Sequence, residues 1–159
     1  MYHAIVKHKI RAIFARINAG DWQAMTSGLA SRFNYRFVGD TPLGGTRNTQ
    51  ASMALWWEGM FRLLPDAQFA PQVIVSKGWP WRTTVMTDVR ISGLVPGPDG
   101  TGQVPYQNEF TRMMTLKWGK ITRVLTLEDT QRFARLLPHL AAAGIADADA
   151  PPIEDKACP

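Results

Sequence analysis

The sequence is poor in metal-binding and redox residues, with a single cysteine, Cys158, and three histidines. One cysteine excludes an internal disulfide and is typical of proteins in a reducing compartment, so we predict a cytoplasmic protein. The histidines do not have metal-ligand spacing, and neither a Walker loop nor a dinucleotide fingerprint is present. We therefore expect no metal and no cofactor.

Long apolar runs are also absent, because no segment approaches the roughly 20 residues of a membrane span. The first residues, Met1 to Ala4, lead directly into a charged segment without the apolar core of a secretion signal. We expect no secretion signal and no membrane partner.

Acidic residues are scarce in the first 36 positions, which contain one acidic residue, Asp21. The same segment contains six basic residues: Lys7, Lys9, Arg11, Arg16, Arg32 and Arg36. The formal net charge is +5, and it arises in this segment because the remainder of the chain balances. Such a pattern fits a solvated helix face, and it also fits an anion or nucleic-acid patch. No nucleic-acid motif accompanies it, so nucleic acid is the less favoured partner.

Apolar residues of the first segment recur with helical spacing. They are Val6, Ile10, Ile13, Phe14 and Ile17. This pattern predicts an amphipathic helix over 3–19. Gly20 can end that helix in a left-handed conformation, and Asp21 can cap a second helix over 22–30.

The next segments alternate in type. Residues 32–38 have the period-2 pattern of a strand, and the Gly- and Pro-rich segment 39–47 is predicted to be a loop. Asn48 or Thr49 can cap a third helix, which ends at Pro65. Beyond Pro65 the period changes to 2, and Asp129 can cap a last helix that reaches about Leu140. The expected strands cover 69–77, 83–91, 106–118 and 121–127.

These elements give the order ααβαββββα. We predict an α+β domain over residues 1–140, in which helices partly wrap a curved antiparallel sheet. Residues 141–159 are rich in Ala, Asp and Pro and are predicted to form a flexible tail.

Four motifs carry a family resemblance. They are Asn18-Ala19-Gly20-Asp21-Trp22, the loop Gly39 to Arg47, Trp118-Gly119-Lys120-Ile121, and Glu128-Asp129-Thr130 before Phe133. Their order and spacing resemble the SnoaL-like group of the nuclear transport factor 2-like (cystatin-like cone) superfamily. The resemblance implies a conical domain, a pocket between the helices and the concave sheet, and a homodimer through the sheet.

The superfamily supports many chemistries, so each of its known site positions has to be matched to a residue of this chain. The resemblance to ketosteroid isomerases places Ile13 and Arg112 where those enzymes have their oxyanion donors, and Phe37 at the base position. Asp40 lies three residues beyond Phe37. Loss of both donors argues against that isomerisation, because oxyanion stabilisation is usually the largest catalytic contribution.

The cyclases and epoxide hydrolases of the group carry a key Asp in the last strand, and that position is Thr126 here. The hydrolases also carry Arg-x-Asp on a middle strand, whereas this chain has the reverse order, Asp88-Val89-Arg90. Glu128 lies two residues beyond Thr126, on the same strand face, and can replace the missing carboxylate.

Asp40 is the leading proton-transfer candidate, because the expected fold places its loop near the pocket mouth. Asp88, Arg90 and Arg112 are candidate electrostatic partners, with Glu128 as a second acid. A further set is expected to line a ligand pocket: Tyr35, Trp56, Trp57, Met60, Phe110 and Trp118.

Three functions remain open from the sequence. The first is a cofactor-free acid–base enzyme (isomerase, cyclase, dehydratase or hydratase) acting on a small apolar molecule. The second is a non-catalytic ligand-binding or dimerisation module on the same fold. The third is binding of a nucleic acid or an anionic surface through the first helix.

Overall fold

The computed structural model describes residues 1–155, and residues 156–159, including Cys158, lie outside the described part. The chain begins with helix α1, Tyr2–Asn18, which buries Val6, Ile10, Phe14 and Ile17 and confirms the predicted amphipathic helix. Gly20 follows with a φ of 85°, the left-handed conformation expected after a helix end.

Helix α2, Gln23–Thr26, is a single turn and is shorter than the predicted 22–30. It has no side-chain cap, so the capping role expected for Asp21 was wrong. The Asp21 carboxylate instead accepts a hydrogen bond from Nε of Arg16 over 2.7 Å. Pairing with the last turn of α1 takes the carboxylate away from the start of α2.

The strands of residues 1–155 form one six-stranded sheet in the order β2-β1-β6-β5-β4-β3. Strands β1 and β6 are parallel, and the other neighbouring pairs are antiparallel. The bounds are Leu29–Val38 for β1, Gly45–Arg47 for β2, Gln68–Trp79 for β3, Arg82–Pro96 for β4, Gln103–Lys117 for β5 and Lys120–Glu128 for β6. The short β2 lies in the segment predicted to be a loop.

Helices α3, Gln50–Leu63, and α4, Thr130–Ala142, follow the predicted capping chemistry. The Thr49 side chain accepts a hydrogen bond from the backbone N–H of Ser52, and Asp129 does the same for Arg132. These bonds satisfy N–H groups that the first helical turn leaves free. The Asp129 cap fixes where β6 ends and α4 begins.

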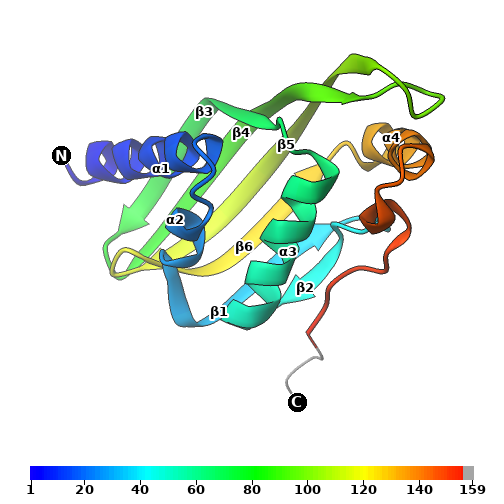
Figure 1. Ribbon diagram of the computed structural model, residues 1–159. Coiled ribbons are helices and arrows are strands. Elements are labelled where there is room, and N and C mark those ends of the chain that lie inside the picture. The colour runs from blue at the N-terminus through cyan, green and yellow to red at the C-terminus, as the bar shows by residue number, and fades with distance from the viewer. Residues whose placement is uncertain (156–159) are drawn as a thin grey trace.

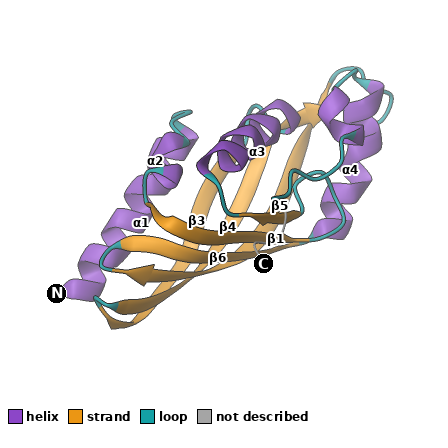
Figure 2. Ribbon diagram, turned by 90° about the horizontal axis from the view of Figure 1, so that it is seen from below, coloured by secondary structure: helices purple, strands orange, loops and turns teal. Residues whose placement is uncertain are grey.

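The elements form two layers. Helices α1, α2 and α3 lie over one face of the curved sheet, and α4 lies beyond one end of its strands (Figures 1 and 2). The core fills the space between this face and the helices, with Met53, Val89, Val124 and Phe133 among its fully enclosed side chains. The α+β prediction is confirmed. No helix within residues 1–155 has the length and apolar character needed to cross a membrane.

Residues beyond Ala142 contact the domain, although composition predicted a flexible tail. The short 3₁₀ helix η1, Ala146–Asp149, places Asp147 beside Arg62 of α3, with an Nε–Oδ2 distance of 2.7 Å. Further along, the Asp155 carboxylate accepts hydrogen bonds from the backbone N–H groups of Asn48 and Thr49 and from the Ser52 hydroxyl. The segment therefore runs past β2 to the start of α3, as Figure 1 shows.

Candidate functional site

Arg112 is a buried cation on the helix-facing side of the sheet. Strand β5 points alternate side chains to this face, and Arg112 lies opposite Thr126 of β6, with 4% of its surface exposed. Its Nε donates a hydrogen bond to the Thr126 hydroxyl over 3.1 Å, and its Nη2 donates to the Tyr35 hydroxyl over 3.0 Å. The guanidinium carbon lies 4.8 Å from the centre of the Phe110 ring.

The hydrogen-bond partners of Arg112 are neutral. Among residues 1–155 no carboxylate lies within ion-pair distance of it. A buried charge without a counter-charge is costly, and cation–π contact with Phe110 offsets only part of that cost. The arrangement therefore suits an anion, or an oxygen that becomes negative during a reaction, next to the guanidinium.

Glu128 ends β6 opposite Phe110, on the same strand face as Thr126. Its Oε2 atom is enclosed and has no hydrogen-bond partner among the described residues. Burial, followed by the charge of Asp129, raises the pKa of Glu128, the amide of Asn108 offsets part of the shift, and the resulting pKa is about 8. The carboxyl is therefore mostly protonated at pH 7 and can both donate and accept a proton close to neutrality.

Arg112 and Glu128 line one cavity of about 20 Å³ between α3 and the sheet. Their positions on β5 and β6 are diagonal neighbours across the strand pair, and such residues typically lie roughly 7–8 Å apart. The volume holds about one water molecule. The other lining residues are apolar: Phe37, Leu43, Trp56, Trp57, Met60, Leu64, Phe69, Ile91 and Phe110.

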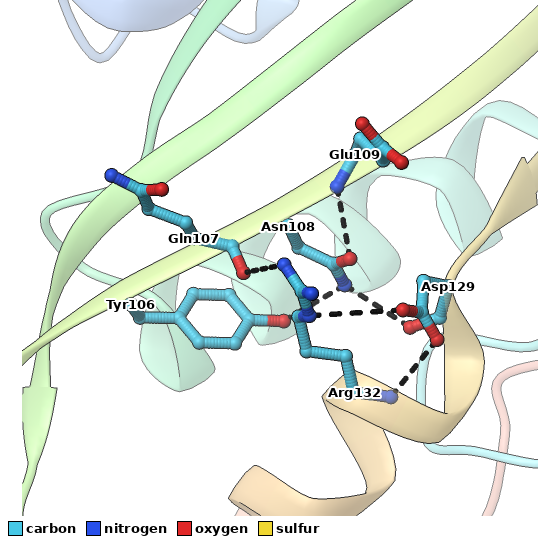
Figure 3. Close-up of polar contacts among 6 residues, drawn as sticks. All are labelled: Tyr106, Gln107, Asn108, Glu109, Asp129 and Arg132. Carbon is cyan, nitrogen blue, oxygen red and sulfur yellow. Dashed lines mark hydrogen bonds and ion pairs between the residues drawn. The ribbon is translucent and has the colours of Figure 1, made fainter.

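A polar cluster of residues from β5 and from the start of α4, among them Tyr106, Asn108, Asp129 and Arg132, lies where β6 ends (Figure 3). The amide nitrogen of Asn108 donates to the Tyr106 hydroxyl over 2.9 Å and to the Asp129 carbonyl over 3.2 Å. Arg132 donates to the Gln107 carbonyl over 3.2 Å. Burial, followed by the charge of Glu128, raises the pKa of Tyr106 well above its usual value, so this hydroxyl stays protonated. The cluster fixes the strand end from which Glu128 projects.

Arg47 of β2 is a second buried cation, and it contacts Tyr35, the hydrogen-bond partner of Arg112. It donates hydrogen bonds to the carbonyl oxygens of Gly44, Gly45 and Ile153 over 2.8–3.0 Å. Burial lowers the pKa of Arg47 to about 10, so the guanidinium remains charged at pH 7. Its guanidinium carbon lies 5.6 Å from the centre of the Tyr35 ring. Tyr35 therefore contacts two buried arginines, Arg47 through its ring and Arg112 through its hydroxyl.

The structure separates the predicted site residues into two groups. Asp40, Asp88 and Arg90 are exposed and do not line the cavity. The cavity brings together Arg112, Glu128 and most of the predicted lining residues: Trp56, Trp57, Met60 and Phe110.

Two predicted lining residues lie elsewhere. Tyr35 is fully buried behind Arg112, and Trp118 is 73% exposed at the turn between β5 and β6. Sequence reasoning missed Arg47 and Asn108. Arg47 closes a Gly-rich loop on a three-residue strand that leaves no periodic signal, whereas Asn108 follows the inward-facing period of Phe110 and Arg112 and could have been found.

The family comparison gives a direct match. The family model for the SnoaL-like domain matches residues 10–124. No curated protein matches the chain significantly.

Several solved structures share the fold. TerC, co-crystallised with polyporic acid, has 21% identity and a TM-score of 0.62, with 81% of this chain and 95% of TerC covered. A loop-truncation variant of IdmH has 18% identity and a TM-score of 0.64, covering 82% of this chain and 98% of IdmH. An NTF2-like protein of unknown function from Burkholderia pseudomallei has 15% identity and a TM-score of 0.65, covering 82% of this chain and 95% of that one. The chain belongs to the SnoaL-like domain family and has the NTF2-like fold.

Proposed function

We propose that this protein is a cofactor-free acid–base enzyme in which Glu128 transfers a proton and Arg112 stabilises the resulting oxyanion. One observation carries the proposal: a buried cation that has no counter-ion within residues 1–155 and a carboxyl with a pKa near 8 line the same apolar cavity. Groups with pKa values near the working pH are effective in general acid–base catalysis. Asp40, the leading candidate from sequence, is not used because it is exposed.

The proton transfer balances without a cofactor. Ionised Glu128 takes a proton from a carbon next to a carbonyl group, and the electron pair of the broken C–H bond moves into the carbonyl to form an enolate. Arg112 donates a hydrogen bond to the enolate oxygen in a low-dielectric site, where such stabilisation is strong. Protonated Glu128 then returns the proton to carbon, so the carboxylate is regenerated.

The substrate class follows from the cavity wall. Phe37, Trp56, Trp57 and Phe110 offer aromatic surface, which fits a small apolar carbonyl compound. The cavity has a volume of only about 20 Å³. Binding of such a compound therefore requires α3 or the loop that carries Leu43 to move outward. TerC, whose structure contains polyporic acid, shows that a protein with this fold can hold an organic molecule.

Deuterium exchange tests the proposal without knowledge of the natural substrate. Small aryl ketones, such as 1-tetralone, are incubated with the protein in D2O, and uptake of deuterium next to the carbonyl is followed by mass spectrometry. We expect exchange above the buffer rate, lost in Glu128→Gln and retained in the matched control Asp40→Asn. Exchange that is equal in both variants would contradict the role of Glu128.

The alternative is a non-catalytic module that binds a small apolar ligand, and the apolar lining of the cavity fits it. Under this proposal, naphthalene-sized probes bind in a fluorescence titration while no ketone exchanges deuterium. Replacing Met60 with Trp would then weaken binding by filling the cavity, whereas a substitution at exposed Asp88 would not.

We also propose a homodimer through the outer face of the sheet, where Val73, Val75 and Met86 are about half exposed. Sedimentation equilibrium should give the mass of two chains, and Val75→Asp with Met86→Asp should give the mass of one. The cytoplasmic location remains a prediction from cysteine usage.

A further inference from the structure

Three tryptophans lie exposed at one end of the sheet. Trp79 and Trp81 flank the turn between β3 and β4, and Trp118 is at the turn between β5 and β6, with 67%, 54% and 73% of their surfaces exposed. The rings of Trp79 and Trp81 are parallel within 3°, with centres 5.6 Å apart, and Trp118 lies 6.3 Å from Trp81. Large aromatic side chains gathered on a surface mark interaction sites.

A backbone hydrogen bond between the two turns holds the tryptophans in this arrangement, and Trp118 adopts an unfavourable backbone conformation. The Trp118 N–H donates a hydrogen bond to the Pro80 carbonyl over 2.7 Å and joins the two turns. Among residues 1–155, Trp118 is the one non-glycine residue with positive φ, at 50°. That conformation is unfavourable for a residue other than glycine, because its Cβ atom comes too close to the following carbonyl oxygen. Burial of the ring does not offset the cost, because Trp118 is mostly exposed.

The charge around these tryptophans has one sign. The two turns and their strand ends carry four exposed cations: Lys77, Arg82, Lys117 and Lys120. The segments 67–87 and 110–127 contain no acidic residue, and neither does 1–20. Helix α1 lies against this end, where Tyr2 hydrogen-bonds Thr83 and His3 hydrogen-bonds Ser76.

An apolar groove of about 100 Å³ lies between α1 and the turn joining β5 to β6. Ile5, Ile10, Leu116 and Ile121 line its apolar wall, and Lys9 lines it as a cation. Ile5 is 49% exposed, so α1 offers apolar surface at this groove.

We propose that this tryptophan patch, formed by Trp79, Trp81 and Trp118 with the four cations, docks onto the surface of an anionic lipid bilayer. Tryptophan favours the boundary between headgroups and acyl chains, and each nearby Lys or Arg adds attraction to anionic lipid. Such docking needs no membrane-spanning segment. The inference is independent of the proposed catalytic role.

Charge and stacking favour this partner over two others. A second copy that docked tryptophan patch against tryptophan patch would bring the same four cations together, which opposes that contact, whereas the dimer proposed above uses Val73, Val75 and Met86 of the sheet face. Single-stranded nucleic acid needs free aromatic faces for its bases, but Trp79 and Trp81 use one face each to stack on one another. An anionic bilayer buries the exposed aromatic edges and attracts the four cations.

Vesicle flotation tests the proposal with the full chain. We expect binding to vesicles of phosphatidylserine and phosphatidylcholine, much weaker binding to phosphatidylcholine alone, and loss of binding as salt rises. Lys77→Glu with Lys117→Glu should weaken binding at least tenfold. The matched control, Arg36→Glu with Arg135→Glu, changes net charge equally at exposed positions elsewhere and should retain more binding.

Trp81→Ser with Trp118→Gly tests the aromatic contribution, and glycine at 118 removes the strain at positive φ, so the variant should fold. We expect at least tenfold weaker binding. The proposal is overturned if no vesicle binds, if both charge variants lose binding equally, or if the tryptophan variant binds normally. It is also overturned if the tryptophan variant instead loses self-association or binding to single-stranded DNA.

Discussion

The Nη2 atom of Arg112 donates a 3.0 Å hydrogen bond to the hydroxyl of Tyr35, which joins strands β5 and β1 across the intervening β6. The bond fixes the guanidinium against the cavity wall, since Thr126 holds only its Nε atom. Tyr35 therefore acts as a positioning residue in the proposed site, and its removal gives the first prediction.

Tyr35→Phe should lower the free energy of unfolding by about 1.5–3 kcal/mol, because a buried hydrogen bond to a charged group is lost. Urea denaturation measures the change. The phenylalanine ring at position 35 would keep the aromatic contact with Trp56. Phe37→Leu, which removes another ring that contacts Trp56, serves as the packing control. An unchanged midpoint would show that Arg112 does not depend on this hydroxyl.

The raised pKa of Glu128 predicts a pH-dependent stability. Its folded-state pKa of about 8 lies above the unfolded value, so its favourable contribution is complete below pH 4.5 and is lost as pH rises to about 8. Glu128→Gln stays neutral, and its melting temperature should therefore exceed that of wild type by more at pH 8.5 than at pH 5. A pH-independent difference would place the pKa of Glu128 near its usual value.

The same pKa predicts the pH profile of the proposed deuterium exchange. The reaction requires ionised Glu128, so its rate should rise about tenfold per pH unit below pH 8 and level off above it. Exchange measured from pH 5.5 to 9.5 checks the profile. A rate that falls across this range would assign Glu128 the role of a general acid.

Asp155 predicts a link between the C-terminal segment and α3. Burial raises the pKa of Asp155, but hydrogen bonds from Asn48, Ser52 and Thr49 outweigh it and hold the pKa below its usual value. Asp155→Ala should cost about 1–2 kcal/mol of unfolding free energy at pH 7, like the loss of a helix cap. The cost should shrink in strong acid, where wild-type Asp155 also loses its charge. Asp149→Ala, at an exposed position, is the control for chemical denaturation.

Arg47 predicts a difference between arginine and lysine. Its guanidinium binds three carbonyl oxygens at once, a fork geometry that an ammonium cannot reproduce. Arg47→Lys should lower the unfolding free energy by about 1–3 kcal/mol, which urea titration would show. Exposed Arg36→Lys should have almost no effect. Equal stability of the two variants would contradict a specific role for the fork.

Periodicity determined most of the secondary structure in advance. The spacing of Val6, Ile10, Phe14 and Ile17 indicates one helix face, and these residues are buried in α1. The change to period 2 beyond Pro65 likewise marks the long strands. The three-residue β2 escaped notice because it spans too few residues to show a period. Asp21 was misassigned because its competing partner, Arg16, lies on the preceding helix.

The sequence by itself determined the α+β class, the family resemblance, and that Arg112 and Glu128 are candidate site residues. Only the tertiary structure decided which ionisable groups share a cavity, because strand pairing places Glu128 beside Phe110 and leaves Asp88 and Arg90 on the exposed face. It also placed Asp155 at the start of α3 and Ile153 against Arg47. Those contacts join positions more than 100 residues apart, and local residue patterns do not encode such distances.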